Sequence, residues 1–350
     1  MIKNTIQFID LRGKTLIDLL RAYPDKAMEI INASKGMRGL ASRIASKIAL
    51  PYADKKSHKW LKFSYNPHLY EIESFAEILE VPGVFSLNVC YEWACTSGVY
   101  RTDETVSLLR VMDWPLPSIG KHVCVALQSS KAGEFYNVTW PGLSGVFNAM
   151  APGRFSAALN LAPMREHQVG KLGDWIINRA MVAKESGLPP SHLLRRVFEQ
   201  ATSYEAAKKM LMETPIAVPA IFTLSGVSQG EGCIIERLEK KAEVIELGAG
   251  QQLSTSNHFN TALAQEGKGW RPREIDSAGR HKQGCAIHGY DLEVNHFDWL
   301  RAPIINQNTR LAIIADAATR RLVIQGFEGM ATITELFNLP DESLQRREAV

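Results

Sequence analysis

The order of strand-like and helical stretches restricts the fold of this chain more than any other feature. Short apolar stretches with turn residues between them predict strands at 105–112, 122–127, 135–140, 143–148 and 155–159. Helical patterns follow at 172–184, 193–200 and 203–212, and strands return at 220–224, 233–238, 242–247, 252–256, 309–315 and 321–327. Because strands and helices come in blocks, the sequence predicts a layered, antiparallel-rich α+β fold and argues against a Rossmann-type sheet.

The first 94 residues have a different pattern, with one predicted strand at 6–11 and then mainly helices. Apolar residues recur at helical spacing from Met37 to Ile48, opposite a basic face of Lys35, Arg38, Arg43 and Lys47, and Pro51 is expected to end this helix. A second helix is predicted at 69–79. The first helix either packs on a core with its basic side in water or lies on an anionic membrane surface. We prefer the first interpretation, and the lysines at 55, 56, 59 and 62 around Trp60 add some weight to the second.

Composition excludes several classes of protein. The chain has 350 residues, 45% apolar and 22% charged, with a net charge of +3. That charge is too small to indicate a nucleic-acid partner. The five cysteines include no CxxC pair, so neither a zinc site nor a disulfide framework is predicted. The sequence contains no GxGxxG or GxxxxGK[ST] motif and no signal or membrane-spanning segment, so we expect a cytoplasmic protein without a cofactor.

The candidate catalytic centre is Cys95, in the sequence Cys95-Thr96-Ser97 at the end of an apolar stretch. If the chain were cut before this residue, Cys95 would carry a thiol nucleophile and an α-amine base together. Arg110 and Asp113 follow 15 and 18 residues later on a predicted strand. The arginine would favour the thiolate and the aspartate would orient the amine. A strand sends these two side chains to opposite faces, so we expect a bend or bulge near Met112.

Asn257 ends a predicted strand, where its side-chain amide could donate to an oxyanion. Each candidate also has an ordinary structural interpretation. Cys95 could be a small core residue, Arg110 and Asp113 a buried ion pair, and Asn257 a turn residue. We interpret Cys90, Cys124 and Cys233 as core residues, and His258, His281 and His288 as loop residues without a metal-binding arrangement.

Taken in order, the motifs resemble the acid ceramidase and N-acylethanolamine acid amidase family, which are cysteine N-terminal-nucleophile hydrolases of the choloylglycine hydrolase superfamily. The segment 86–92 resembles the approach to that family's cleavage point, and Cys95-Thr96-Ser97 its nucleophile motif. Arg110-Val111-Met112-Asp113 resembles a family strand, and 152–156 a loop and strand beside the site. The longest match runs from Thr202 through Pro219-Ala220 to Cys233.

The resemblance implies self-cleavage of the Ala94–Cys95 bond and a four-layer αββα sandwich, the N-terminal-nucleophile (Ntn) hydrolase fold, with an N-terminal helical segment. Residues 1–94 would be a pro-region that stays bound as a small α subunit, and residues 95–350 the catalytic β subunit. Cys95 would be the nucleophile, Arg110 and Asp113 would set its thiol and amine, and Asn257 would bind the oxyanion. A further family arginine falls on Arg280, with Arg271 and Arg273 as competitors.

The implied activity is hydrolysis of an N-acyl amide lipid, of the ceramide or N-acylethanolamine type, to a fatty acid and an amine through a thioester at Cys95. Residues 25–62 would contact a membrane or micelle. The family has an Asn-Glu pair where this chain has Asn160-Leu161, which puts substrate recognition in question. Two alternatives stay open. One is a penicillin or bile-salt amide hydrolase or an acyltransferase of the same superfamily, and the other is an unprocessed, non-catalytic lipid-binding relative.

Overall fold

The computed structural model describes residues 3–36, 39–89, 93–102, 104–271, 275–294 and 297–340. Side chains at 34–49 and at 293–294 lie outside this description.

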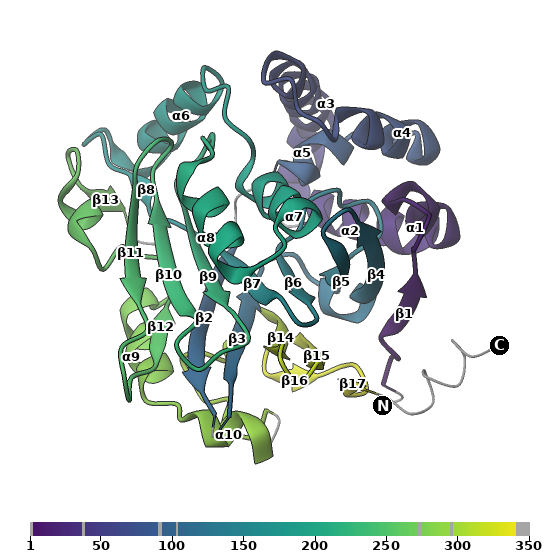
Figure 1. Ribbon diagram of the computed structural model, residues 1–350. Coiled ribbons are helices and arrows are strands. Elements are labelled where there is room, and N and C mark those ends of the chain that lie inside the picture. Colours follow the sequence, from purple (N-terminus) through teal and green to yellow (C-terminus); the bar gives the residue numbers. More distant parts are fainter. Residues whose placement is uncertain are drawn as a thin grey trace.

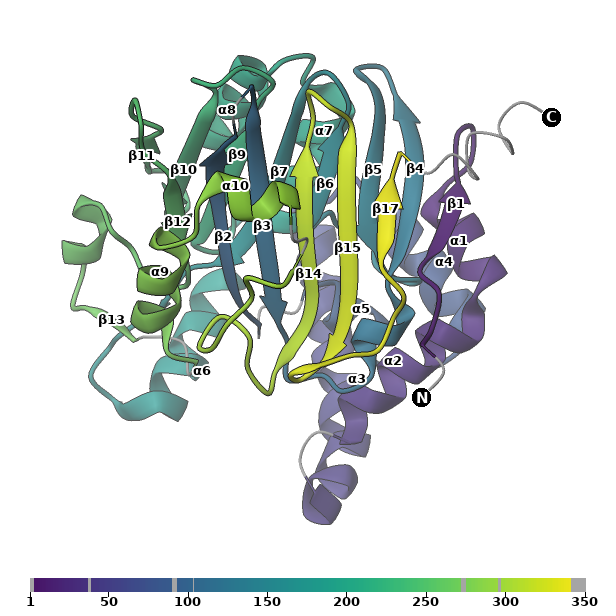
Figure 2. The ribbon, with the colours of Figure 1, turned by 90° about the horizontal axis from the view of Figure 1, so that it is seen from below.

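Two β-sheets stacked face to face form the centre of the molecule (Figure 2). The eight-stranded sheet has the order β1 (Gln7–Asp10), β4 (Cys124–Ser130), β5 (Gly133–Thr139), β6 (Asn148–Ala151), β7 (Phe155–Leu161), β9 (Ala220–Ser225), β10 (Gly232–Arg237) and β11 (Ala242–Glu246). The seven-stranded sheet has the order β12 (Leu253–Thr255), β2 (Ala94–Arg101), β3 (Val106–Asp113), β14 (Thr309–Asp316), β15 (Arg321–Glu328) and β16 (Ala331–Thr332), with β17 (Phe337–Leu339) also on β15. A small third sheet pairs β8 (Met164–Arg165) with β13 (Trp270–Arg271). The two large sheets meet where β2 and β3 pack on β7 and β9.

Helices cover both outer faces of this pair of sheets (Figures 1 and 2). The eight-stranded sheet is covered by α7 (Pro190–Gln200) and α8 (Tyr204–Glu213), and α6 (Gly170–Val182) packs beside β8. The seven-stranded sheet is covered by α9 (Ser277–Cys285) and α10 (Gly289–Val294). Helices therefore enclose two central sheets, and the predicted four-layer αββα arrangement of an α+β protein is confirmed.

The described N-terminal residues form a strand and a group of helices at one edge of the molecule (Figure 1). β1 pairs in parallel with β4, and α1 (Leu16–Ala22), α2 (Pro24–Gly36), α3 (Gly39–Phe63), α4 (Leu69–Leu79) and α5 (Val84–Asn88) follow. None of the described helices is both long and apolar enough to cross a membrane. The membrane hypothesis named Arg38, Arg43 and Lys47, and these side chains lie outside the described part of the chain.

The prediction that Pro51 ends the first long helix is wrong, because α3 continues through it to Phe63. A proline inside a helix removes one backbone hydrogen bond and crowds the preceding turn. Tertiary contacts beyond Pro51 offset this loss. Trp60 and Leu61 are buried, and the carboxylate of Asp54 accepts hydrogen bonds from the backbone N–H groups of Gly83 at 2.8 Å and Ser86 at 2.7 Å.

Two other predictions differ from the structure. In the predicted strand 143–148 only Asn148 lies in a strand, because Leu143, Val146 and Phe147 enter the core from a loop. The polar stretch 257–296 contains α9 and α10, which were not predicted. α9 has almost no apolar periodicity, and its first turn is stabilised by Asp276, whose carboxylate accepts the N–H of Gly279 at 2.9 Å.

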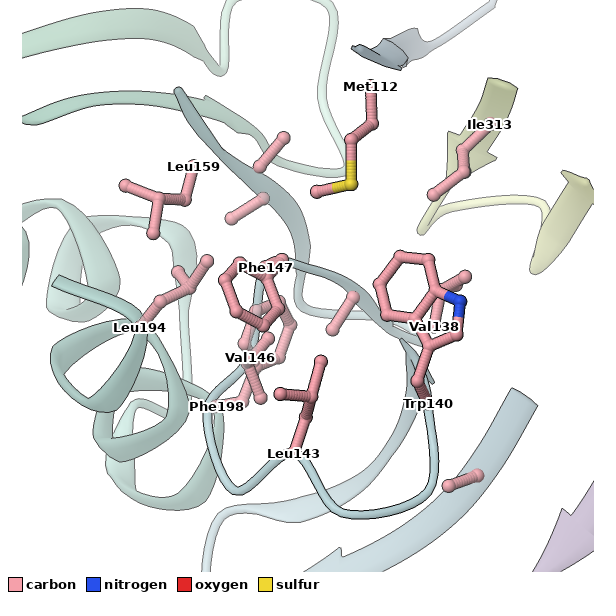
Figure 3. Close-up of a cluster of buried hydrophobic side chains, with 14 of the residues drawn as sticks. Met112, Val138, Trp140, Leu143, Val146, Phe147, Leu159, Leu194, Phe198 and Ile313 are labelled. Carbon is pink, nitrogen blue, oxygen red and sulfur yellow. The ribbon is translucent and has the colours of Figure 1, made fainter. Parts of the chain in front are cut away.

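The main hydrophobic core joins both sheets to α7 (Figure 3). Met112 and Ile313 enter it from the seven-stranded sheet, and Leu194 and Phe198 enter it from α7. Trp140 and Phe147 lie between them in Figure 3. This core is continuous beneath Cys95, so the first residues of β2 are fixed in a dry, closely packed environment.

Candidate active site

Cys95 is the second residue of β2 and is fully buried between the two sheets. In the β2–β3 pair, Cys95 lies opposite Met112 and Ser97 lies opposite Arg110. Since alternate residues of a strand share a face, the side chains of Cys95, Ser97 and Arg110 all point toward the eight-stranded sheet. The hydroxyl of Ser97 confirms this direction, because it donates to Asn160 Oδ1 on β7 at 3.1 Å.

Arg110 is a buried cation on the thiol side of Cys95. Its Nη1 donates to Asn160 Oδ1, and Asn160 Nδ2 donates to the carbonyl of Ser256 at 3.0 Å. Nε and Nη2 of Arg110 have no hydrogen-bond partner among the described residues. Burial raises the pKa of the Cys95 thiol to about 11, while Arg110 opposes the rise and Asp113 adds to it. In the intact chain the thiol is therefore protonated at neutral pH.

Asp113 lies on the other face of β3, opposite Ala94 in the sheet, beside the peptide bond that joins Ala94 to Cys95. Its Oδ1 accepts a hydrogen bond from Thr309 Oγ1 at 2.8 Å. Its Oδ2 lies 3.8 Å from Arg280 Nη1 and accepts no hydrogen bond within the described ranges. Burial raises the pKa of this carboxyl group, and Arg280 opposes that effect.

The expected bend in β3 is wrong. β2 and β3 pair without a register shift from Ala94 opposite Asp113 to Arg101 opposite Val106. The irregularity lies in the neighbouring strand β14, between Thr309 and Leu311. No bend is required because Arg110 and Asp113 reach different parts of the same residue. One faces the side of the thiol, and the other faces the side of the peptide bond.

Asn257 follows β12 and holds the backbone nitrogen of Cys95. Its Oδ1 accepts hydrogen bonds from Cys95 N at 2.8 Å and from Arg280 Nη2 at 2.8 Å. Both partners are donors, so the group facing Cys95 must be the amide oxygen. Its Nδ2 donates to the carbonyl of Leu161 at 2.7 Å. Leu161 thus contributes a backbone acceptor, and its side chain lies in the hydrophobic core.

Arg280 reaches Cys95 from α9. Its Nη1 donates to the carbonyl oxygen of Cys95 and to Thr96 Oγ1, the latter at 3.1 Å. Arg271 lies elsewhere and binds Asp174 at 2.5 Å and Glu166 at 3.0 Å. The third candidate, Arg273, falls outside the described residues. Of the two described candidates, Arg280 is the one that the fold brings to Cys95.

Close packing of α9 on β12 and β2 brings Arg280 to this position. Gly284 makes the packing possible, since a Cβ there would overlap Ser254 and contact Thr96. At the other end of the helix, Ser277 Oγ accepts the N–H of Asn257 at 2.9 Å. α9 is therefore attached to the strand end at one point and packed tightly against it at another.

Several residues around Cys95 were not predicted from the sequence. Thr96 binds Arg280, Thr309 binds Asp113, and Thr223 Oγ1 lies 2.7 Å from Ser97 Oγ. Thr96 and Ser97 lie in the Cys95-Thr96-Ser97 motif, but no local motif marks Thr223 or Thr309, which only the pairing and packing of distant strands bring to the site. The expectation that 152–156 lies beside the site is wrong, since this turn precedes β7 at the end opposite Asn160. Part of the segment 86–92, from Cys90 on, falls outside the described residues.

The described residues include no group of three or more histidine, cysteine, aspartate or glutamate side chains arranged to hold a metal ion. Around Cys95 the described side chains supply a thiol, two guanidinium groups, one carboxyl group and one carboxamide. This set is suited to acyl transfer, with a nucleophile, donors for an oxyanion and a carboxylate for a cationic amine.

No family model matches the chain. The acid ceramidase of Heterocephalus glaber is 30% identical over 233 residues, covering 60% of this chain and 57% of that protein. Human acid ceramidase is 30% identical over 246 residues, covering 63% of this chain and 60% of that protein. A solved structure of the Caenorhabditis elegans N-acylethanolamine-hydrolyzing acid amidase ortholog superposes with a TM-score of 0.46 at 18% identity, covering 64% of this chain and 93% of that chain.

The chain therefore spans about three fifths of the length of the curated relatives that it matches. The similarity at 30% identity recurs in proteins that all carry the same description. By sequence, this chain is similar to the acid ceramidases over about three fifths of its length.

Proposed function

We propose that this protein is a self-processing cysteine amidohydrolase that cleaves N-acyl amide lipids through a thioester at Cys95. One observation carries the proposal: the thiol and the backbone nitrogen of Cys95 contact different groups of the protein. The thiol side faces Arg110, and the backbone nitrogen is bonded to Asn257 Oδ1 at 2.8 Å with Asp113 beside it. A cysteine that served only to fill the core would need neither arrangement.

Self-cleavage begins with attack of the Cys95 thiol on the carbonyl carbon of Ala94. The C–N bond of the Ala94–Cys95 peptide breaks, a thioester forms, and the proton of the thiol ends on the nitrogen that becomes the α-amine. Water then hydrolyses the thioester, which releases the carboxylate of Ala94 and frees the thiol. Arg280, bound to the carbonyl oxygen of Cys95, and Asn257, bound to its nitrogen, hold this segment in place.

In the mature enzyme the α-amine of Cys95 accepts the thiol proton, and the thiolate attacks the acyl carbon of the substrate. The amine product leaves with that proton, and water then releases the fatty acid from the thioester. The new ammonium group needs more acceptors than the peptide N–H that it replaces. Asn257 Oδ1 supplies one, and Asp113 Oδ2, which accepts no hydrogen bond in the described structure, supplies a second.

The aromatic surroundings of the cleavage point support an apolar acyl group as substrate. Trp93, two residues before Cys95, packs 5.3 Å from Trp114 and 5.1 Å from Phe147, measured between ring centroids. Trp140 lies 6.2 Å from Trp114, between ring centroids, and extends this buried aromatic cluster. The relatives at 30% identity are described as ceramidases, which is the substrate class that we propose.

We further propose that residues 1–94 stay bound as a subunit after cleavage, with 95–350 as the catalytic part. Two kinds of contact support this. β1 is an edge strand of the eight-stranded sheet, paired with β4. Arg195 Nη1 on α7 is 2.5 Å from Glu71 Oε1 on α4, and both side chains are buried. The cysteines at 95, 124, 233 and 285 are free, which fits the reducing, cytoplasmic location that we also propose.

Peripheral contact with a membrane or micelle is part of the proposal. Exposed apolar side chains lie on α3 at Tyr52 and Phe63, and on α6 at Leu172 and Ile176. The two helices project from the same side of the molecule (Figures 1 and 2). Trp60 does not take part, because it is buried and its Nε1 donates to the carbonyl of Glu185 at 2.9 Å.

Vesicle sedimentation tests this contact. Ile176→Glu should reduce binding to anionic phosphatidylcholine–phosphatidylserine vesicles, whereas Met330→Glu, at an equally exposed site between β15 and β16, should not. Equal binding by both variants would contradict the contact.

Intact-mass analysis of the purified protein tests self-cleavage. We expect two pieces divided between Ala94 and Cys95, and we expect Cys95→Ala to remain whole. The mature protein should then release fatty acid from long-chain ceramide or N-acylethanolamine faster than it hydrolyses penicillin V or glycocholate. The opposite preference would favour the penicillin or bile-salt alternative. A chain that stays whole and inactive at every pH would favour the non-catalytic alternative, for which Leu161 is the supporting feature.

A further inference from the structure

The loop after β12 and the start of α9 are joined by one buried hydroxyl group, that of Ser277. We propose that Ser277 is a positioning residue for the reaction at Cys95, which holds Asn257 and Arg280 at a fixed separation, and that His258 completes its hydrogen bonding. This inference rests on the proposed function. It adds Ser277 and His258, which do not touch the reacting atoms and act only through Asn257 and Arg280.

Ser277 lies where it can control both partners of Cys95. It is the first residue of α9 and is 6% exposed, and its Oγ accepts the backbone N–H of Asn257 at 2.9 Å. Arg280 lies one turn further along the same helix. The side chains of Asn257 and Arg280 meet at 2.8 Å and bind the nitrogen and the carbonyl oxygen of Cys95. A shift of α9 relative to Asn257 would therefore change both contacts with Cys95.

The hydrogen bonds around Ser277 have a defined direction. The N–H of Asn257 can only donate, so Ser277 Oγ is the acceptor and keeps its own hydrogen for another partner. His258 Nδ1 lies 2.7 Å from Oγ and accepts that hydrogen when the ring is neutral with its proton on Nε2. A protonated ring would instead present an N–H to Oγ, and the hydrogen of Ser277 would lose its acceptor.

The surroundings of His258 favour the neutral ring. Burial lowers the pKa of His258, and the neighbouring His281 and Arg280 on α9 lower it further, while Asn260 opposes the shift. The rings of His258 and His281 are 5.3 Å apart in an edge-to-face arrangement. The carboxylate of Glu236 on β10 opposes the lowering of the pKa of His281 and accepts the N–H of Asn260 at 2.6 Å.

Loss of the hydroxyl would leave the buried N–H of Asn257 without its acceptor. An unsatisfied buried donor is unfavourable, so the loop is expected to move until the N–H finds water. Misplacement of a catalytic group by about 1 Å can lower a rate by about 100-fold. We therefore expect Ser277→Ala to lower kcat of the mature enzyme by about 10- to 100-fold, with KM changed less than about threefold.

The test compares four variants by intact mass and by steady-state hydrolysis of a long-chain N-acylethanolamine. Ser277→Thr keeps the hydroxyl and should restore kcat. Ser203→Ala is the matched control, since Ser203 also accepts a backbone N–H at a helix start, from Ala206 at 3.2 Å, but caps α8 on the eight-stranded sheet. It should leave kcat unchanged. His258→Asn keeps an acceptor near the Nδ1 position and removes the titrating ring, so it should retain activity and lose any acidic limb that the ring contributes to the pH profile.

Equal kcat for Ser277→Ala and the wild type, when the wild type is cleaved and active, would overturn the inference and leave the proposed function intact. Failure of Ser277→Thr to restore kcat would also overturn it. If Ser277→Ala does not fold, a comparison of two His258 variants replaces it. His258→Leu, which cannot accept the hydrogen of Ser277, must then lower kcat relative to His258→Asn for the inference to stand. A wild type that is neither cleaved nor active would overturn the proposed function, and this inference with it.

Discussion

Acid should weaken the fold through a buried histidine that joins the N-terminal part to the rest of the chain. His192 on α7 is fully buried. Its Nδ1 lies 2.8 Å from Asn66 Nδ2, and its Nε2 lies 2.8 Å from Ser144 Oγ. Asn66 Oδ1 accepts the N–H of His68, so its NH₂ group must donate to Nδ1. His192 then carries its proton on Nε2 and donates it to Ser144 Oγ. Its Nδ1 accepts a hydrogen bond from Asn66, so this nitrogen cannot bind a second proton without breaking that bond.

The magnitude follows from the shift in pKa. Burial lowers the pKa of His192 from 6.5 to about 3, and Arg195 contributes to the shift. Below pH 6.5, the pKa of histidine in the unfolded chain, the unfolded chain binds a proton that the folded chain excludes. The contribution of neutral His192 to the folding free energy is therefore fully present above pH 6.5 and is lost as the pH falls toward 3. At 1.36 kcal/mol per pH unit, acidification from pH 7.5 to pH 5 should remove about 2 kcal/mol of folding free energy through His192 alone.

Other groups in the same network also titrate, so the effect must be isolated by comparison. Burial lowers the pKa of His68, which adds to the loss in acid. Burial raises the pKa of Glu71, and Arg195 opposes this effect. A carboxyl group with a raised pKa binds a proton more readily in the folded chain, so Glu71 stabilises the fold as the pH falls. His192→Gln keeps a side chain that can hydrogen-bond with Ser144 and Asn66 but does not titrate. The difference between this variant and the wild type therefore reports His192.

The assay is urea unfolding at pH 7.5 and pH 5, with the mature two-piece protein also passed through a size-exclusion column at each pH. We expect the wild type to lose about 2 kcal/mol more than His192→Gln between the two pH values. His288→Gln, at an exposed position, serves as the control and should behave like the wild type. An equal loss in the wild type and in His192→Gln would refute the reasoning that His192 is held neutral by the fold.

Three further variants test the packing around Cys95. Gly284→Ala should push α9 away from Ser254, lower the free energy of unfolding by about 1–3 kcal/mol and slow self-cleavage. Gly230→Ala is the control, because a Cβ there meets nothing within 4 Å. It should change neither urea unfolding nor the rate of cleavage followed by intact mass. Asn160→Ala should lower the free energy of unfolding by about 3 kcal/mol, because Arg110 and Ser97 lose their shared acceptor. A loss below about 1 kcal/mol would contradict the role given to Asn160. Trp93→Ala should lower the free energy of unfolding by about 3–5 kcal/mol, because it opens a cavity beside Trp114 and Phe147. The measurement is urea unfolding in a Cys95→Ala background, which stays uncleaved. A much smaller loss would show that the aromatic cluster does not hold this segment.

The layered α+β fold could be predicted from the sequence because its cause is local. Hydrophobic periods and turn residues indicate each strand and helix, and their order in blocks excludes an alternating sheet. The same local reasoning failed at α9 and α10, whose polar sequences have little apolar periodicity. It also failed at Pro51, where burial of Trp60 and the bonds of Asp54 outweigh the local preference.

At the site, the sequence by itself determined the types of chemical group and their spacing. Cys95, Arg110 and Asp113 belong to one strand pair, so alternation alone placed Arg110 on the thiol face and Asp113 on the other. Only the tertiary structure decided how Asn257 and Arg280 reach Cys95. Both come from segments more than 160 residues later in the chain, and the hydroxyl of Ser277 and the absence of a side chain at Gly284 hold them there. Contacts of this kind depend on the close approach of distant backbones, for which the local sequence carries no periodic signal.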